Sequence, residues 1–211
     1  MPRAARPRPD RPEATPSAPV PTPVPVWALA SAVVAPIAMI GGWTLAQALQ
    51  PSFDPVRETI STLAEADRTA PVVLGAALVV TGLAHLVTAA GLGRLRPLGR
   101  AALALGGLAT LAVGLLPSDA HPLPHGIAAG IGFGALALWP VLTTRRAGAP
   151  IERPTATVTA SVVLLALVGS FVVQLAGGES SPAIGLTERL AAGAQSLWPL
   201  VVVLALRRRR D

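Results

Sequence analysis

The chain has 211 residues, of which 52% are hydrophobic and only 13% are charged. Soluble domains carry about a quarter charged residues, so this composition excludes an ordinary soluble domain. The net charge is +6, all 17 basic residues are arginines, and the absence of cysteine excludes disulfides, thiolate metal sites and cysteine nucleophiles.

The first 26 residues are predicted to form a tail. They contain nine prolines and four arginines, and too few apolar side chains to build a packed element. We expect residues 1–26 to be a disordered Pro/Arg-rich cytoplasmic tail. A transmembrane domain is expected over residues 27–206, followed by a basic cytoplasmic C-terminus over residues 207–211.

Between these ends, the apolar residues gather into six long runs. A helix of about 20 apolar residues is long enough to cross a bilayer core of about 30 Å. The runs therefore predict an all-α, polytopic membrane protein with six transmembrane helices in a compact bundle. The predicted spans are residues 27–49, 71–92, 100–116, 125–144, 155–176 and 187–206.

The longest charged stretch within the chain is QPSFDPVRETISTLAEADRTAP, residues 50–71, between the first two predicted spans. Asp54 is a favourable N-cap, and the proline after it suits the first helical position. Val56, Ile60 and Leu63 then recur at helical spacing. This pattern predicts a short outer amphipathic helix from about residue 55 to 67, lying flat on the membrane surface.

The arginines predict the orientation of the bundle. Cytoplasmic loops of membrane proteins carry an excess of Lys and Arg. With the N-terminus inside, 14 of the 17 arginines are cytoplasmic, and only Arg57, Arg68 and Arg189 lie outside. We therefore expect a multi-pass protein of the cell (plasma) membrane with both termini in the cytoplasm.

Most of the strongly polar residues gather at the predicted outer end of the bundle. Polar residues that converge in or near a membrane indicate a functional site. We expect an outward-facing polar vestibule, in which Arg189 pairs with an acid from another segment, Asp119 or Glu58. The candidate ligand-binding residues are Asp54, Arg57, Glu58, Ser61, Asp119, His125, Glu188 and Arg189.

His85 lies deep in the second predicted span, away from this end. We expect it to be a structural hydrogen-bond partner between helices, as polar residues in spans often are. A role in proton relay is the alternative.

Small residues recur every four positions in two predicted spans. Such stripes let helix backbones approach closely, so we expect both to lie at helix–helix contacts. They are Gly106, Thr110 and Gly114 in the third span, and Gly126, Gly130 and Gly134 in the fourth.

The sequence contains no established catalytic signature. Asp119, His121 and His125 are residue types that can bind zinc, but prolines interrupt any helical spacing between them, and no HExxH motif occurs. Ser61 with a histidine and an acid has the composition of a catalytic triad without a GxSxG turn. These observations favour a non-catalytic protein with no metal and no cofactor.

Several short blocks occur in order along the chain: DPVRETISTLA, TGLAHLVTAAGL, LLPSD, LALWP and GLTERLAAGAQSLWP. With these blocks the chain resembles, over about residues 27–206, the bacterial membrane proteins catalogued as Domain of Unknown Function 998 (DUF998). The resemblance implies a multi-helix membrane protein of uncharacterised function. By position, the family's recurrent polar residues fall on Asp54, Glu58, Ser61, His85, Asp119, His125, Glu188 and Arg189.

The leading hypothesis is a protein of the lipid bilayer that binds a small molecule, a lipid head group or a protein partner at the outer face. No nucleic-acid partner is expected. One alternative is a membrane-embedded hydrolase, metal-dependent or not, that acts at the same face. The other is a secondary transporter, which needs a polar path through the midplane.

Overall fold

The structure of the chain is a computed structural model that describes residues 23–178 and 181–208. Within these residues it contains six α-helices, two short 3-10 helices and no strand. The α-helices are α1 (Val26–Ala48), α2 (Val72–Gly91), α3 (Pro97–Leu115), α4 (Pro122–Leu142), α5 (Pro154–Ala176) and α6 (Ile184–Arg207). The 3-10 helices are η1 (Ser61–Ala64) and η2 (Pro150–Glu152).

All six α-helices are long and apolar enough to cross a membrane. The predicted all-α, multi-pass architecture is therefore confirmed.

Three of the helices begin at a proline, namely α3, α4 and α5. Proline suits this position because its fixed φ is helical and its missing N–H would have no partner there. The prediction that His125 begins the fourth helix is wrong, because the helix already begins at Pro122. Most of the predicted tail, residues 1–22, and residues 209–211 lie outside the described part of the chain.

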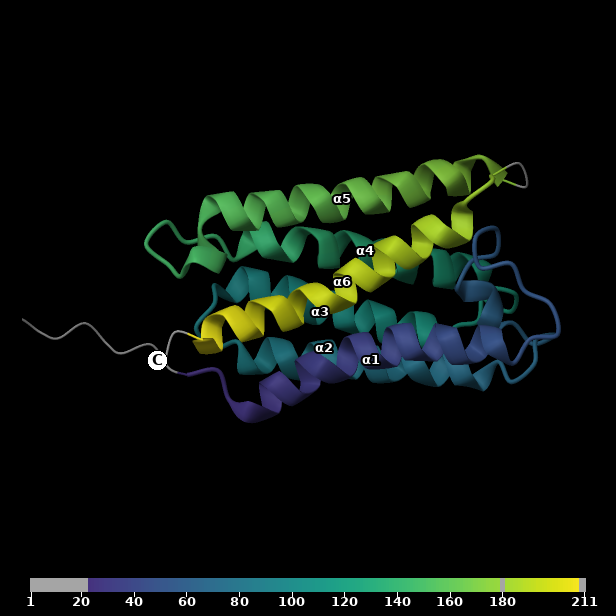
Figure 1. The fold of residues 1–211 in the computed structure, drawn as a ribbon, viewed down its shortest axis with the longest axis horizontal. Helices are drawn as coiled ribbons and strands as arrows, with labels where there is room; N and C mark the ends of the chain where they lie inside the picture. The colour runs from purple at the N-terminus through teal and green to yellow at the C-terminus, as the bar shows by residue number, and fades with distance from the viewer. Residues whose placement is uncertain (1–22, 179–180, 209–211) are drawn as a thin grey trace, which may run out of the picture.

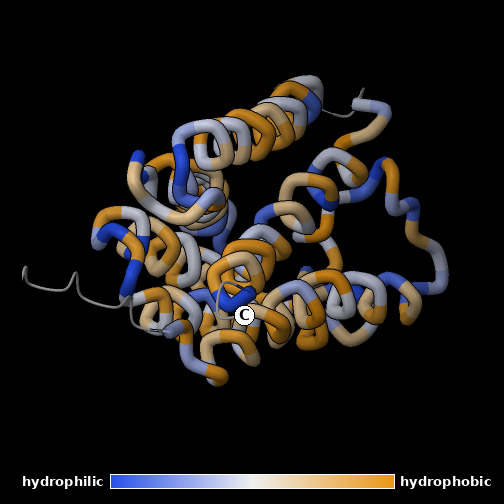
Figure 2. The backbone as a smooth tube through the Cα atoms, turned by 60° about the vertical axis from the view of Figure 1, so that its left-hand side comes forward, coloured by the Kyte–Doolittle hydropathy of each residue, from blue (hydrophilic) through white to orange (hydrophobic). Residues whose placement is uncertain are grey.

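The helices pack in chain order around a ring, which closes where α6 packs against both α1 and α5 (Figure 1). The start of α1 and the end of α6 lie at the same end of the bundle, where Arg207 donates a hydrogen bond of 2.7 Å to the carbonyl of Val24. We call this the terminal end. The opposite end carries residues 49–71, 116–121, 177–178 and 181–183, and we call it the loop end. Figure 2 shows apolar residues along the helices and more hydrophilic residues in several connections.

Close glycine contacts join α2 to α3. A Cβ atom placed on Gly82 would lie 2.5 Å from the carbonyl oxygen of Gly107, and one on Gly114 would lie 2.7 Å from that of Gly75. In the stripe predicted for the third span, Gly114 thus lies against α2 and Gly106 lies against Leu136 of α4, whereas Thr110 lines a cavity. The stripe of the fourth span is different, because a Cβ atom on Gly126, Gly130 or Gly134 would meet nothing within 4 Å. The prediction of a close helix contact there is wrong, and this face of α4 borders a cavity instead.

Two apolar clusters hold the bundle together. One lies toward the terminal end and surrounds Trp139, which is completely buried. The other lies toward the loop end and includes Trp43, Leu74 and Leu63. Leu63 belongs to η1, which lies in the connection between α1 and α2. Its buried side chain anchors this connection in the apolar cluster.

The predicted helix over residues 55–67 is much shorter in the structure. Only Ser61–Ala64 is helical, as a single 3-10 turn, and Val56 is exposed whereas Ile60 is buried. Side chains of other segments take up backbone N–H groups that a continued helix would use: Glu188 accepts from Ile60, and Asp119 accepts from Ala66. Such side-chain bonds compete with helical hydrogen bonds and stop the helix from propagating.

Candidate functional site at the loop end

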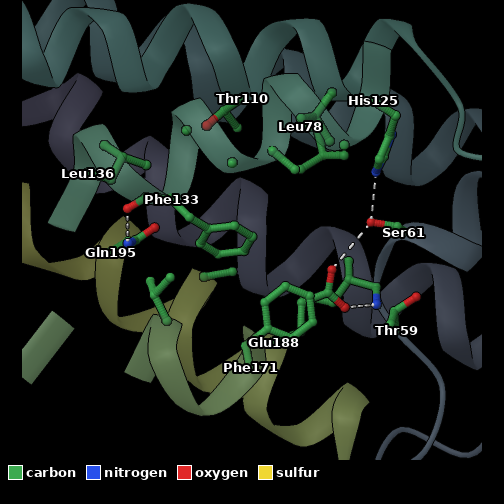
Figure 3. A pocket seen from close by; sticks show the side chains of 18 of the residues that line it. Thr59, Ser61, Leu78, Thr110, His125, Phe133, Leu136, Phe171, Glu188 and Gln195 are labelled. Atoms are coloured by element: carbon green, nitrogen blue, oxygen red, sulfur yellow. Dashed lines mark hydrogen bonds between the residues drawn. The ribbon is translucent and has the colours of Figure 1, made fainter. Parts of the chain in front are cut away.

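Three polar side chains from three different segments meet beneath η1. The Oγ atom of Ser61 lies 3.2 Å from Nε2 of His125 and 3.3 Å from a carboxylate oxygen of Glu188 (Figure 3). The second carboxylate oxygen of Glu188 accepts a short hydrogen bond from the backbone N–H of Ile60. Ser61, His125 and Glu188 are called the polar cluster below. Because they come from η1, α4 and α6, only the folded bundle assembles it.

His125 lies in the first turn of α4, and the connection before this helix holds its imidazole in place. Its Nδ1 atom lies 2.7 Å from the carbonyl oxygen of Leu116, in the connection before α4. A carbonyl oxygen can only accept, so Nδ1 carries the proton and donates it. In the neutral ring Nε2 is then an acceptor. Ser61 has a single hydroxyl proton, which it can donate either to this nitrogen or to Glu188.

Arg189 fastens the connection between α1 and α2 to α6. Its guanidinium donates to the carbonyl oxygens of Pro55 and Glu58, both at 2.9 Å, and lies 5.4 Å from the ring centroid of Phe53. It forms no ion pair within the described residues. The predicted pairing of Arg189 with the carboxylate of Asp119 or Glu58 is therefore wrong. The backbone of Glu58, and not its carboxylate, is the partner.

Gly185 permits the close approach of these two segments. A Cβ atom at this position would collide with the carbonyl group of Glu58. One residue further on, the N–H of Leu186 donates to the carbonyl oxygen of Val56 at 3.1 Å. The start of α6 and the connection before η1 thus share backbone contacts that any larger residue at position 185 would disrupt.

The connection between α3 and α4 also reaches this segment. Asp119 accepts a hydrogen bond of 3.0 Å from the backbone N–H of Ala66, and Ser118 donates one of 2.8 Å to the carboxylate of Glu65. The connection between α3 and α4 therefore meets the connection between α1 and α2 at the loop end, through residue pairs other than the one predicted for Arg189. His121 is exposed at the N-cap of α4, and the described residues hold no group of three or more metal-ligand side chains.

The remaining candidates lie on the exposed side of the connection. Asp54 caps the backbone N–H of Val56, and Arg57 pairs with Asp54 at 3.8 Å while its side chain remains 73% exposed. The carboxylate of Glu58 pairs with Arg68 at 2.9 Å. These three residues shape the connection but do not line the cavity described next.

A cavity of about 550 Å³ extends from the polar cluster into the bundle. Its lining is mostly apolar and includes Phe133 of α4 and Phe171 of α5, whose ring centroids lie 5.5 Å apart. In Figure 3, the ring of Phe133 lies between the polar cluster and Gln195, which donates to the carbonyl oxygen of Phe133 at 2.9 Å. The glycines Gly126, Gly130 and Gly134 leave the wall of α4 without side chains. The cavity is therefore a consequence of that glycine stripe.

His85 lines the inner part of the same cavity. Its side chain is almost fully buried, at 1% exposed, and its Nδ1 atom has no hydrogen-bond partner among the described residues. The hydrogen bond between helices predicted for it is not made by this atom. Its neighbour Thr88 makes such a bond instead, with Ser31 of α1 at 2.8 Å.

Several lining residues were not among the sequence-based candidates. Glu65 stood out only as one charge in a long charged stretch, and Phe133 and Phe171 resemble ordinary core residues. The glycine stripe of α4 was the available signal, because a stripe of small residues that no helix covers leaves space beside it.

A family model described as "Protein of unknown function (DUF998)" matches residues 32–205. The chain belongs to this family. The match confirms the resemblance carried by the short sequence blocks, and it includes the polar cluster and every residue that lines the cavity. No curated protein and no solved structure matches the chain. The DUF998 description states no activity.

Proposed function

We propose that this member of the DUF998 family binds an amphiphilic small molecule in the cavity. The polar group of the ligand lies at Ser61, His125 and Glu188, and its apolar part lies along Phe133 and Phe171. The observation that carries the proposal is the cavity itself: about 550 Å³, mostly apolar, with polar groups gathered at one end. Small-molecule sites have volumes of about 300–1,000 Å³ and the same division between apolar walls and a few polar groups.

The ligand enters from the lipid, between α4 and α5. Both helices contribute exposed residues to the cavity lining: Gly126 and Gly130 on α4, and Val172 and Leu175 on α5.

The proposal includes the orientation of the bundle. The loop end faces outward from the plasma membrane and the termini are cytoplasmic, which the 14-to-3 distribution of the 17 arginines supports.

A cavity-filling substitution tests the binding. In Gly134→Leu the new side chain begins in open space on the cavity wall, so it occupies the cavity without displacing the backbone. Gly169→Leu is the matched control, because Gly169 is equally free of neighbours but is exposed and does not line the cavity. Gly130→Leu provides a second filling variant.

The readout is the shift in unfolding temperature that dodecanol or dodecylamine produces in protein held in lipid nanodiscs. We expect both probes to stabilise the wild type and Gly169→Leu, and to lose their effect on Gly134→Leu and Gly130→Leu. Equal shifts in all four proteins would show that the probes act through the lipid, and the proposal would fail.

A second candidate function is hydrolysis of an ester, and one specific geometry favours it. His125 is held by Leu116 with Nε2 facing Ser61 at 3.2 Å, which is the relation between a general base and its nucleophile. In such a reaction Nε2 takes the proton of Ser61 while Oγ bonds to the ester carbonyl carbon. The departing alcohol receives that proton, and water then releases the acyl group with His125 again as base.

A fluorophosphonate probe, which reacts covalently with activated serines, tests this candidate. The hydrolase predicts labelling of the wild type and of Ser118→Ala, and loss of labelling in Ser61→Ala and His125→Ala. Ser118 is the matched control because it also lines the cavity but bonds to Glu65 rather than to a histidine. Absence of labelling in the wild type would leave binding as the function.

A further inference from the structure

Ion pairing separates the carboxylates of the chain into two sets. Within the described residues, Asp54, Glu58, Asp67 and Glu152 each lie within 4.0 Å of an arginine. The two carboxylates that line the cavity, Glu65 and Glu188, have no such partner in the same part of the chain. No arginine lines the cavity either, so its lining carries two acids and no permanent cation.

Neutral groups hold these two acids. Glu65 accepts from the hydroxyl of Ser118. Glu188 accepts from the backbone N–H of Ile60 and competes with His125 for the single hydroxyl proton of Ser61. The arginines at the loop end have other partners: Arg68 pairs with Glu58, and Arg189 donates to backbone carbonyl oxygens.

Burial makes this arrangement costly for Glu188, which is only 5% exposed. Buried charges in proteins are normally paired with an opposite charge, because hydrogen bonds to neutral groups only partly replace the lost hydration. The charge of the adjacent Arg189 attracts Glu188 but does not reach it as an ion pair. A cation that enters the cavity would supply the contact partner that Glu188 lacks.

An independent observation at the other end of the cavity also points to a ligand. Nδ1 of His85 has no hydrogen-bond partner among the described residues, although the side chain is 1% exposed and lines the cavity. A buried polar atom without a partner is unfavourable because its lost hydration is not replaced, so native structures rarely retain one. A polar atom at the far end of a ligand would satisfy it.

We propose that the ligand is a cationic amphiphile, an amine or quaternary ammonium compound, whose charge lies between Glu65 and Glu188. Its apolar body lies beside Phe133 and Phe171, and a hydrogen-bonding atom at its other end meets His85. This inference rests on the proposed binding function and adds the chemical class of the ligand. An anionic head group is excluded by the same reasoning, because it would face two carboxylates and no arginine.

The test compares three probes that share one alkyl chain and differ in charge: dodecyltrimethylammonium, dodecanol and dodecanoate. Their affinities are measured by thermal shift in nanodiscs of uncharged lipid, on the wild type, Glu188→Gln, Glu65→Gln and Glu58→Gln. Glu58→Gln is the matched control, since Glu58 is an acid of the same connection that pairs with Arg68 and lies outside the cavity lining.

For the wild type and Glu58→Gln we expect the cation to bind about tenfold more tightly than dodecanol, which corresponds to about 1.4 kcal/mol. Dodecanoate should bind most weakly. Glu188→Gln keeps an oxygen to accept from Ile60, and it should lose the preference for the cation while still binding dodecanol. Glu65→Gln should lose part of the preference, and it provides the test if Glu188→Gln does not fold.

The outcomes separate this inference from the proposed function. If dodecanol binds in the cavity as tightly as the cation, or if neither glutamine variant changes the preference, the ligand is not cationic but the binding function stands. If no probe distinguishes the wild type from Gly134→Leu, the binding function fails and this inference fails with it.

Discussion

Single residues at the loop end act mainly through backbone contacts. Arg189 illustrates this, because its charge is used to hold two carbonyl oxygens of the connection between α1 and α2 rather than to form an ion pair. A guanidinium presents several donors in a fixed plane, so one side chain can bind several carbonyl groups at once. The carboxylates of Asp54 and Asp119 accept hydrogen bonds from backbone N–H groups of the same connection.

Asp119 should make stability depend on pH in a specific range. Its pKa is lowered from the ordinary value of 3.8, chiefly because the backbone N–H of Ala66 donates to its carboxylate. A carboxylate whose pKa is lower in the folded state contributes stability above its unfolded pKa, and loses it as the pH falls through the folded value. The contribution of Asp119 is therefore complete above pH 3.8 and declines below it.

The variant Asp119→Asn measures this contribution. The difference in unfolding temperature between wild type and variant should be constant above pH 3.8 and should shrink as the pH is lowered further. Asp67→Asn is the control, since the Asp67 side chain is 82% exposed and lies 4.0 Å from its nearest cation, Arg68. A difference for Asp119→Asn that does not vary with pH would contradict the assignment of the Ala66 hydrogen bond.

At the scale of elements, the same residue type has opposite consequences on two helices. The glycines of α2 and α3 bring two backbones together, whereas those of α4 face the cavity. The contacting glycines are seven residues apart in α2 and in α3, and the glycines that face the cavity are four apart in α4, so each set lies on one face of its helix. What differs is whether a second helix lies against the stripe, and only the packing of the bundle decides that.

A glycine in close backbone contact and a glycine with free space beside it should respond differently to substitution by alanine. Gly82 of α2 and Gly41 of α1 provide this comparison. Gly82→Ala places a Cβ atom 2.5 Å from the carbonyl oxygen of Gly107 and 2.7 Å from the amide nitrogen of Leu111. Both are backbone atoms that cannot move aside, so we expect a loss of about 1–3 kcal/mol. Gly41→Ala meets nothing within 4 Å and should gain about 0.5–1 kcal/mol from the higher helix propensity of alanine.

Unfolding in mixed detergent micelles, followed by circular dichroism, provides the measurement for both variants. Gly82 and Gly41 lie on neighbouring helices of the same ring, so general effects of the detergent apply to both. If Gly82→Ala were as stable as Gly41→Ala, the close contact between α2 and α3 would not exist.

For the whole molecule, the ring of six helices places the connections at two opposite ends. Asp67 lies at the loop end, and Arg146 lies in the connection between α4 and α5 at the terminal end. Because the chain has no cysteine, Asp67→Cys and Arg146→Cys each introduce a single thiol at an exposed position.

We expect an impermeant thiol reagent to label Asp67→Cys in intact cells, and Arg146→Cys only after the membrane is opened. The reason is the excess of arginine at the terminal end, which favours the cytoplasmic side. Labelling of both variants in intact cells would contradict a six-span topology. The reverse pattern would retain the fold and invert the proposed orientation.

Much of this architecture was determined by the sequence itself. Six apolar runs require six helices, because a backbone inside a bilayer must satisfy its own hydrogen bonds and an α-helix does so within one segment. Runs of this length were therefore sufficient to predict the spans to within a few residues, and family blocks such as DPVRETISTLA were sufficient to identify DUF998. Both signals are local in the chain.

The site was decided by the tertiary structure. Ser61 and Glu188 are 127 residues apart in the chain, and no spacing rule relates them. The helix predicted over residues 55–67 did not form because Asp119 and Glu188, which belong to other segments, bind its backbone N–H groups. Sequence patterns specify which face of an element is apolar, but what lies against that face depends on the packing of all six helices.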